Sequence, residues 1–312
     1  MLKVVNQRNA FIIRENDLNQ STIALDTYSY AISNILVGNE ETYPTIEIID
    51  GFAEFQFLEN TFIAITGNAQ IFINGKKIDA LWKCLPIKKG SSLKISTSNG
   101  SIAYLAISGG FVNNPLGRTP LNSNDEVLEV ASPPISQEDL LIEVPARHLP
   151  PRYIPPQDPQ YLKVVPLSDS RFLPNRCLVS EKDPIKGVSL KPVNKMPLES
   201  NILEGDPPPR ILTKNDEDLL VLSSPSDESK PLLGVLPRNS FDALLRKPIG
   251  SSLSFIAISP SQAIREEERY LNKLNKIKHI INLAVNAIKR GATLVKIRFR
   301  NTLYEAWIEE LI

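Results

Sequence analysis

Residues 24–39 read Ala-Leu-Asp-Thr-Tyr-Ser-Tyr-Ala-Ile-Ser-Asn-Ile-Leu-Val-Gly-Asn, and the rest of the chain is best interpreted outward from this stretch. Asp26 can cap a helix because its carboxylate accepts from the free N–H groups of a first turn, and Gly38 can end one. Apolar side chains between them share one helical face: Tyr28, Ala31, Ile32, Ile35 and Leu36. We predict a helix at 26–37 that packs this stripe against a following sheet.

Apolar runs cut by turn residues predict β structure on both sides of this helix. Residues 2–5 and 11–14 predict two separate short strands. From Thr45 the pattern has period two, and Asp50-Gly51 and Asn74-Gly75 interrupt it. Asn74-Gly75 predicts a tight hairpin because a type I′ turn needs positive φ at both central positions. Strands at this density indicate a barrel or a sandwich.

A proline-rich segment separates two β regions. Proline fixes φ and lacks an N–H, so residues 144–160 predict an extended linker. We expect subdomains or segments at 1–143 (β-barrel), 144–160 (linker), 161–260 (second β-barrel) and 261–312 (helix and β-hairpin). Within the last two we expect strands at 161–165, 187–190, 219–222, 232–236 and 253–258, a helix from Ser261 to Gly291, and hairpin strands at 294–300 and 303–308.

Composition removes several classes of protein. The 35 basic and 35 acidic residues of the 312 balance, so no net field favours a nucleic acid or a membrane as partner. No apolar run approaches the roughly 20 residues that cross a bilayer, and no secretory signal is present, so a cytoplasmic location is expected. Two cysteines and two histidines leave little metal or histidine chemistry, and Cys84, Cys177, His148 and His279 are interpreted as structural or surface residues.

Motifs for nucleotide phosphates or for a nucleophilic serine are not found in the sequence. The acidic run at 215–218 is interpreted as a solvated turn, and Asp26 as a helix cap that could also meet a ligand. Gly109-Gly110 is compatible with a tight turn or with close approach of the backbone to a ligand. Alternation in the last hairpin favours one solvated face over a binding patch for its basic residues: Lys289, Arg290, Lys296, Arg298 and Arg300.

Short matches in a fixed order carry a family resemblance. Ile23-Ala24-Leu25-Asp26 leads to Leu36-Val37-Gly38-Asn39, followed by Ile46-Glu47, then Ile-Ala-Ile-Thr-Gly at 63–67 and Tyr-Leu-Ala before Gly109-Gly110. In this order they resemble the allophanate hydrolase subunit 2 family, which includes the C subunit of 5-oxoprolinase and the carboxyltransferase half of urea carboxylase. The resemblance covers most of residues 1–265.

The resemblance implies a fold, a partner and a set of positions. It implies a mainly β chain with two cyclophilin-like β-barrel subdomains and few short helices. It also implies a partner homologous to allophanate hydrolase subunit 1, which corresponds to the B subunit of 5-oxoprolinase. ATP would enter through the assembled complex; no metal or biotin site is expected in this chain. The family pattern leaves the catalytic residues unidentified and marks six substrate-binding candidates: Asp26, Asn39, Glu47, Gly109, Gly110 and Gly187.

Departures from the family fall in loops. The loop at 114–120 is shortened, residues 13–20 lack the family's glycines and arginine, only Gly187 and Leu190 survive in the motif at 184–190, and residues 226–231 are acidic where the family has glycines. Arginine binds a carboxylate through a bidentate fork, so a carboxylate-bearing substrate would be held differently, if at all.

Two hypotheses stay open at this point. The chain is a divergent subunit of a 5-oxoprolinase-like or allophanate hydrolase-like ATP-dependent amidohydrolase that acts on a small amide. Alternatively it is a non-catalytic β scaffold that binds a protein partner or a small ligand and has lost the family's site loops.

Overall fold

The fold is described from a computed structural model. It describes residues 1–312 except 17–22, 113–115, 124–125, 168–172, 175, 184–186, 194–209, 216–217, 223–231, 301 and 310–312. Several expectations therefore lie outside the described residues, wholly or in part: the acidic residues at 216–217, the acidic loop at 226–231, and parts of the loops at 13–20, 114–120 and 184–190.

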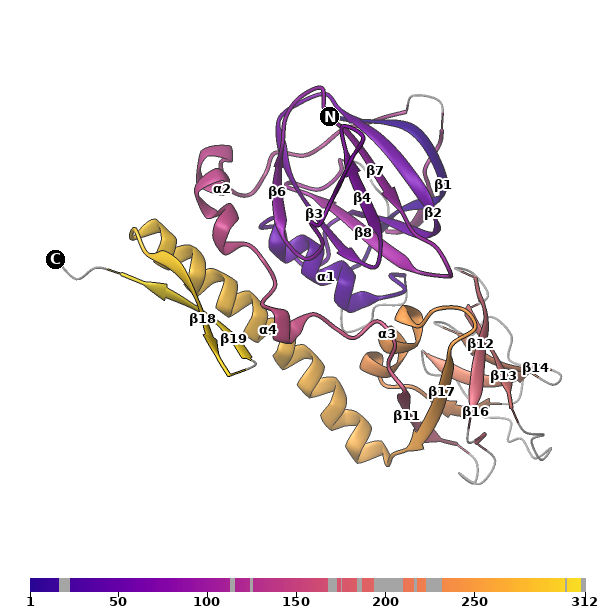
Figure 1. The fold of residues 1–312 in the computed structure, drawn as a ribbon. Coiled ribbons are helices and arrows are strands. Elements are labelled where there is room, and N and C mark those ends of the chain that lie inside the picture. The colour runs from indigo at the N-terminus through magenta and orange to yellow at the C-terminus, as the bar shows by residue number, and fades with distance from the viewer. Residues whose placement is uncertain are drawn as a thin grey trace.

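The first β region is a strongly curved ten-stranded sheet (Figure 1). Seven strands follow the order β5-β4-β7-β2-β8-β3-β6, and β1 pairs with β2, β9 and β10. Its interior is filled by aliphatic and phenylalanine side chains, with Phe55, Ile63 and Ile95 almost fully buried. The strands are β1 (Leu2–Arg14), β2 (Thr45–Phe57), β3 (Thr61–Gly67), β4 (Gln70–Ile73), β5 (Lys76–Ile78), β6 (Cys84–Ile87), β7 (Ser92–Ser96), β8 (Ile102–Ile107), β9 (Gly117–Pro120) and β10 (Val127–Leu128).

Two predictions of a break between strands in this sheet are wrong. The strands expected at 2–5 and 11–14 form one strand, β1, whose pairing with β2 shifts register twice, once between Arg8 and Ala10. The Asp50-Gly51 pair lies inside β2, with Asp50 at φ 43°. In both places β-bulges absorb the polar residues, so the strand bends and continues. The expected turn at Asn74-Gly75 is confirmed, because both residues have positive φ (50° and 74°) between β4 and β5.

The second β region is a closed seven-stranded barrel in the order β11-β16-β14-β15-β13-β12-β17. All five expected strands are present, and the two that were missed are β12 and β14. A further buried helix, α3 (Arg238–Arg246), was not expected either. The strands are β11 (Tyr161–Pro166), β12 (Cys177–Asp183), β13 (Gly187–Pro192), β14 (Ile211–Asn215), β15 (Asp218–Leu222), β16 (Leu232–Val235) and β17 (Ser252–Ala257).

The helix expected at 26–37 is confirmed as α1 (Thr27–Leu36), but it is buried on every side. One side packs on β3 and β8, as expected. The other side is covered by α3 and by the long helix α4 (Pro260–Lys289), so a single apolar stripe does not describe its environment. Helix α1 therefore lies at the centre of the molecule, between the sheet and the barrel (Figure 1).

The linker follows α2 (Gln137–Glu143) directly and contains two short 3-10 turns, η2 (Val144–Ala146) and η3 (Pro151–Tyr153). It is held to both β regions. The Trp82 carbonyl accepts from the Leu149 N–H at 2.8 Å, and the fully buried Lys247 pairs with Asp158. The boundaries between subdomains stay predictions.

Helix α4 crosses from the barrel to the sheet and ends in a hairpin, β18 (Thr293–Phe299) and β19 (Thr302–Ile308), as expected (Figure 1). The helix begins at Pro260, one residue before the expected start at Ser261, because Ser259 caps it and forms a capping box with Gln262. Among the helices that the structure describes, none is both long and apolar enough to cross a membrane.

Candidate functional site

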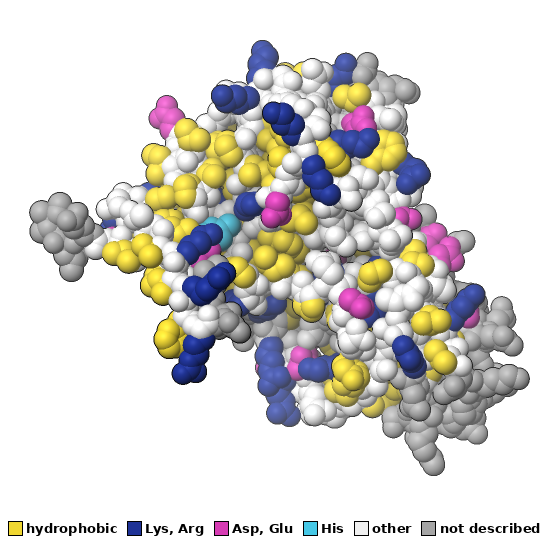
Figure 2. Space-filling model, in the orientation of Figure 1, with side chains coloured by type: hydrophobic (Ala, Val, Ile, Leu, Met, Phe, Trp, Pro, Cys, Tyr) yellow, Lys and Arg dark blue, Asp and Glu magenta, His cyan; other side chains and the backbone are white. Residues whose placement is uncertain are grey.

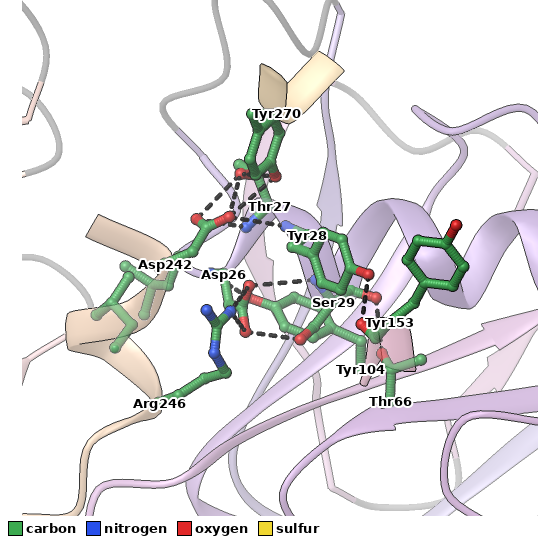
Figure 3. A network of polar contacts seen from close by, with 12 residues as sticks. Asp26, Thr27, Tyr28, Ser29, Thr66, Tyr104, Tyr153, Asp242, Arg246 and Tyr270 are labelled. Carbon is green, nitrogen blue, oxygen red and sulfur yellow. Dashed lines mark hydrogen bonds and ion pairs between the residues drawn. The ribbon is translucent and has the colours of Figure 1, made fainter. Parts of the chain in front are cut away.

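A network of buried charged and hydroxyl-bearing side chains surrounds the start of α1 (Figure 3). Asp26 is 1% exposed and caps the helix as predicted, accepting from the Ser29 N–H at 3.2 Å and the Ser29 hydroxyl at 2.6 Å. Arg246, at the end of α3, donates to both carboxylate oxygens of Asp26 at 3.1 Å. The helix cap is thus also one half of a buried ion pair between the two β regions.

Asp242 of α3 occupies the position where a helix N-terminus binds an anion. Its two oxygens accept from the Thr27 and Tyr28 N–H groups at 3.1 Å each, and the Thr27 hydroxyl donates at 3.0 Å. The Tyr270 hydroxyl of α4 donates at 2.9 Å. A carboxylate from this chain therefore takes the hydrogen bonds that the first turn of α1 could offer to a ligand.

Burial raises the pKa of Asp242 to about 7, and the negative charge of Asp26 adds to this, while Arg246 opposes it. The hydroxyls of Tyr104 and Tyr270 have pKa values well above the ordinary value, first because they are buried. The shift brings the pKa of the Asp242 carboxyl into the neutral range, and burial also lowers the pKa of the nearby Lys182 amine to about 7.

A second carboxylate network holds the residues that precede α1. Glu47 of β2 is fully buried, and its Oε1 accepts from the Leu25 N–H at 3.0 Å and from the Tyr104 hydroxyl at 2.7 Å. The Tyr104 hydroxyl in turn accepts from the Asp26 N–H at 2.7 Å. Arg118 of β9 pairs with the other oxygen of Glu47 at 2.7 Å. These bonds fix the entry of the chain into α1.

The structure places the six substrate-binding candidates in three separate regions. Asp26 and Glu47 meet at the start of α1 through Tyr104. Asn39 and Gly109 meet at its other end, where the Gly109 N–H donates to Asn39 Oδ1 at 2.8 Å. Gly110 follows there, and Gly187 lies in the barrel at the start of β13. The set does not converge on one ligand position.

The glycines among them make close backbone contacts within the chain. A Cβ on Gly109 would lie 2.2 Å from the Ala131 carbonyl oxygen, and one on Gly187 would lie 2.1 Å from that of Val221. Both residues have positive φ (94° and 93°). Packing against the chain itself is therefore sufficient to explain both glycines.

Sequence reasoning missed Asp242, Tyr270 and Arg118 as members of the site. Arg246 was not among the predicted site residues either. Asp242 and Tyr270 lie more than 200 residues after Thr27, with separations of 215 and 243. No local pattern links such positions, and the helix that carries Asp242 was itself not expected.

The two cysteines and two histidines lie outside the network at the start of α1. Cys84 and Cys177 are buried thiols, as predicted. His279 is exposed, and His148 pairs with Glu305 at 2.8 Å. Within the described residues, no three His, Cys, Asp or Glu side chains are grouped to hold a metal ion.

The comparisons with known proteins agree with the fold. The family model "Carboxyltransferase domain, subdomain A and B" matches residues 23–141, which confirms the predicted resemblance over that part of the chain. This segment includes α1, its preceding residues and most of the first sheet.

Two curated relatives match part of this chain. The C subunit of the Haemophilus influenzae 5-oxoprolinase is 32% identical over 91 residues, which are 28% of this chain and 29% of the relative. The urea amidolyase of Saccharomyces cerevisiae is 36% identical over 88 residues, 28% of this chain and 5% of that enzyme. The alignments thus span less than a third of either relative.

Similarity in structure extends much further along the chain. The crystal structure of the Kluyveromyces lactis urea carboxylase superposes with a TM-score of 0.71 at 16% identity, over 88% of this chain and 29% of that one. At this identity the comparison establishes the fold alone. The expected class is confirmed: a mainly β chain with a closed seven-stranded barrel, a half-barrel, few helices, and a C-terminal helix and hairpin.

Proposed function

We propose that this chain is a subunit of an ATP-dependent amidohydrolase complex of the 5-oxoprolinase or allophanate hydrolase kind, in which it serves as the scaffold. The complex would act on a small cyclic or linear amide. Its partner would be a homologue of allophanate hydrolase subunit 1, equivalent to the B subunit of 5-oxoprolinase. This partner, together with any further subunit, would supply the ATP and substrate sites. The family match and the two curated relatives support the complex.

One observation supports a scaffold role over a catalytic one. The first turn of α1 is occupied by Asp242, and Asp26 is neutralised by Arg246. Asp26 and Asp242 are each 1% exposed, so a substrate would have to displace α3 to reach either carboxylate. Moving α3 away would take both Asp242 and Arg246 with it, and would leave the α1 N–H groups and the Asp26 carboxylate without these partners in a dry interior, which is costly.

The test is reconstitution of the complex. Coexpression with a subunit 1 homologue should yield a stable complex, which should open 5-oxoproline or hydrolyse allophanate when ATP is present. Tyr270→Phe removes one hydrogen bond to Asp242 and keeps the ring, so it should leave turnover by the assembled complex unchanged. A complex that assembles and shows no ATP-dependent turnover would remove the enzyme-subunit part of the proposal.

A catalytic role for this chain is the second candidate, and one property of Asp242 favours it. A buried carboxyl whose pKa lies near 7 suits general acid–base chemistry at neutral pH. In that case α3 would move away from α1 on assembly, and turnover would depend on Asp242 itself. Asp242→Asn distinguishes the two candidates, because it keeps the size of the side chain and removes its proton transfer.

A further inference from the structure

A groove of about 470 Å³ lies between the C-terminal hairpin, the last turns of α4 and the proline-rich linker. Its floor is apolar and includes Ile280, Leu283 and Ala287, which fall at helical spacing on α4. Leu283 is 53% exposed, a large value for a leucine within such a hollow. Figure 2 shows apolar side chains gathered in a hollow beside the hairpin, with Lys and Arg side chains at its margin. We refer to this feature as the C-terminal groove.

The groove runs along the edge of β19. Tyr304 and Glu305 are neighbours in one strand, so their side chains point to opposite faces of the hairpin, yet both line the groove. Within the part of the chain that the structure describes, β19 pairs only with β18. Its outer edge therefore offers backbone N–H and C=O groups that an added strand could pair with.

The groove lining has more positively charged than negatively charged side chains. The groove lining includes two arginines, Arg152 and Arg290, and one carboxylate, Glu305; Arg290 already pairs with Glu309 at 2.6 Å. The acidic lining residue, Glu305, already pairs with His148 at 2.8 Å and lies 3.5 Å from Lys296. Arg152, also in the lining, has its guanidinium 4.9 Å from the ring centre of Tyr153, and none of the carboxylates that the structure describes pairs with it. The groove can thus accept negative charge without losing an existing pair.

The hairpin adds to this positive margin. Cross-strand register places Lys296 opposite Glu305 and Leu294 opposite Trp307, so Lys296 and Arg298 share the face that Trp307 presents to α4. The alternation noted in the sequence is real. It directs these basic side chains to the face that borders the groove.

We propose that the C-terminal groove binds an extended acidic segment of the partner protein, as an added strand beside β19. Apolar side chains of that segment would cover Leu283 and Ile280, and its carboxylates would meet Arg152 and the basic residues of the hairpin. The proposal rests on the proposed function only in requiring a partner subunit. It makes no use of the α1 site.

The test measures the affinity of the full chain for the purified subunit 1 homologue by isothermal titration calorimetry. Leu283→Glu places a like charge in the floor and should weaken binding by at least about tenfold, since a truncated or charged anchor at the centre of an interface commonly costs more than 1.4 kcal/mol. Arg152→Glu should weaken binding several-fold, and the loss should shrink at high salt. Ile264→Glu is the matched control: it is on the same helix, 61% exposed, and outside the groove lining, so it should bind like the unmodified chain.

The outcomes separate this inference from the proposed function. If the unmodified chain binds the partner and Leu283→Glu binds equally well, the groove proposal is overturned while the complex stands. If the unmodified chain does not bind, both fall. Self-association by light scattering that Leu283→Glu abolishes, or displacement of the partner by a short DNA duplex, would assign the groove to a second copy or to nucleic acid and would also overturn the proposal.

Discussion

Asp242 and Arg246 bring two neighbouring turns of α3 against the start of α1. Asp242 accepts hydrogen bonds from the N–H groups at the start of α1, and Arg246 forms an ion pair with Asp26. Each buried charge therefore has partners. Removing one partner leaves the others buried and unsatisfied, which commonly costs about 3–5 kcal/mol.

Asp242→Ala should therefore lower the free energy of unfolding by about 3–5 kcal/mol, measured by urea denaturation at pH 7. Asp242→Asn should cost less, because its amide oxygen can still accept from the α1 N–H groups. Equal stability of Asp242→Ala and the unmodified chain would mean that α3 does not pack against α1 in this way.

The raised pKa of Asp242 also makes a prediction about pH. A carboxyl with a higher pKa in the folded state binds protons more tightly when folded, so its contribution to stability is full below its ordinary pKa and declines as pH rises through the folded value. From this group, the free energy of unfolding should fall between pH 3.8 and about 7. The difference between the unmodified chain and Asp242→Asn, measured by urea midpoints at pH 5 and 7.5, should show that fall. An identical pH dependence in both proteins would contradict it.

The two thiols give a simple check on burial. Burial raises the pKa of both Cys84 and Cys177 to about 12, with the charge of Arg147 opposing this at Cys84. Neither should react with Ellman's reagent at pH 8 in the folded protein, and both should react in 6 M urea, roughly as free thiols do. Rapid labelling of either one without denaturant would show that its surroundings open.

At the level of elements, the local sequence correctly predicted helix ends and tight turns, which depend on interactions between adjacent residues. Asp26 lies just before the start of α1 and Gly38 just after its end, and Asn74-Gly75 forms the expected turn. Both features could be predicted because caps and tight turns depend on a few adjacent residues. Helix α3 was missed because Pro237 caps it without a side-chain hydrogen bond and its polar residues are buried by contacts made elsewhere in the fold. The bulges in β1 and β2 were missed because pairing with a neighbouring strand decides whether a polar pair bends a strand or ends it.

A substitution at Gly187 tests whether positive φ and close packing against the chain are sufficient to explain a glycine at this position. Alanine there would adopt an unfavourable φ and would also press its Cβ on the Val221 carbonyl oxygen, so Gly187→Ala should lower the free energy of unfolding by about 3 kcal/mol or more. Gly75→Ala is the control, since Gly75 also has positive φ but no atom lies within 4 Å of its Cβ. It should cost only about 1–2 kcal/mol. Unchanged stability of Gly187→Ala, with loss of ligand binding, would favour a ligand site there instead.

At the level of the whole molecule, α1 lies where the sheet, the barrel and α4 meet. The family-like sequence at 24–39 correctly indicated the fold, because it forms α1, the helix against which both β regions pack. It could not reveal that α3 closes the first turn of α1, since that contact joins residues more than 200 positions apart. The scaffold proposal comes from this contact, and the partner proposal from the groove at the far end of α4.

The most direct test is the turnover number of the assembled complex with Asp242→Asn. The complex with the unmodified chain should open 5-oxoproline or hydrolyse allophanate with ATP, and the complex with Asp242→Asn should keep its kcat within about twofold at pH 7.5, because a scaffold residue does not touch the reacting atoms. A loss of about 100-fold or more in a complex that still assembles would place the chemistry at α1 and would contradict the scaffold role.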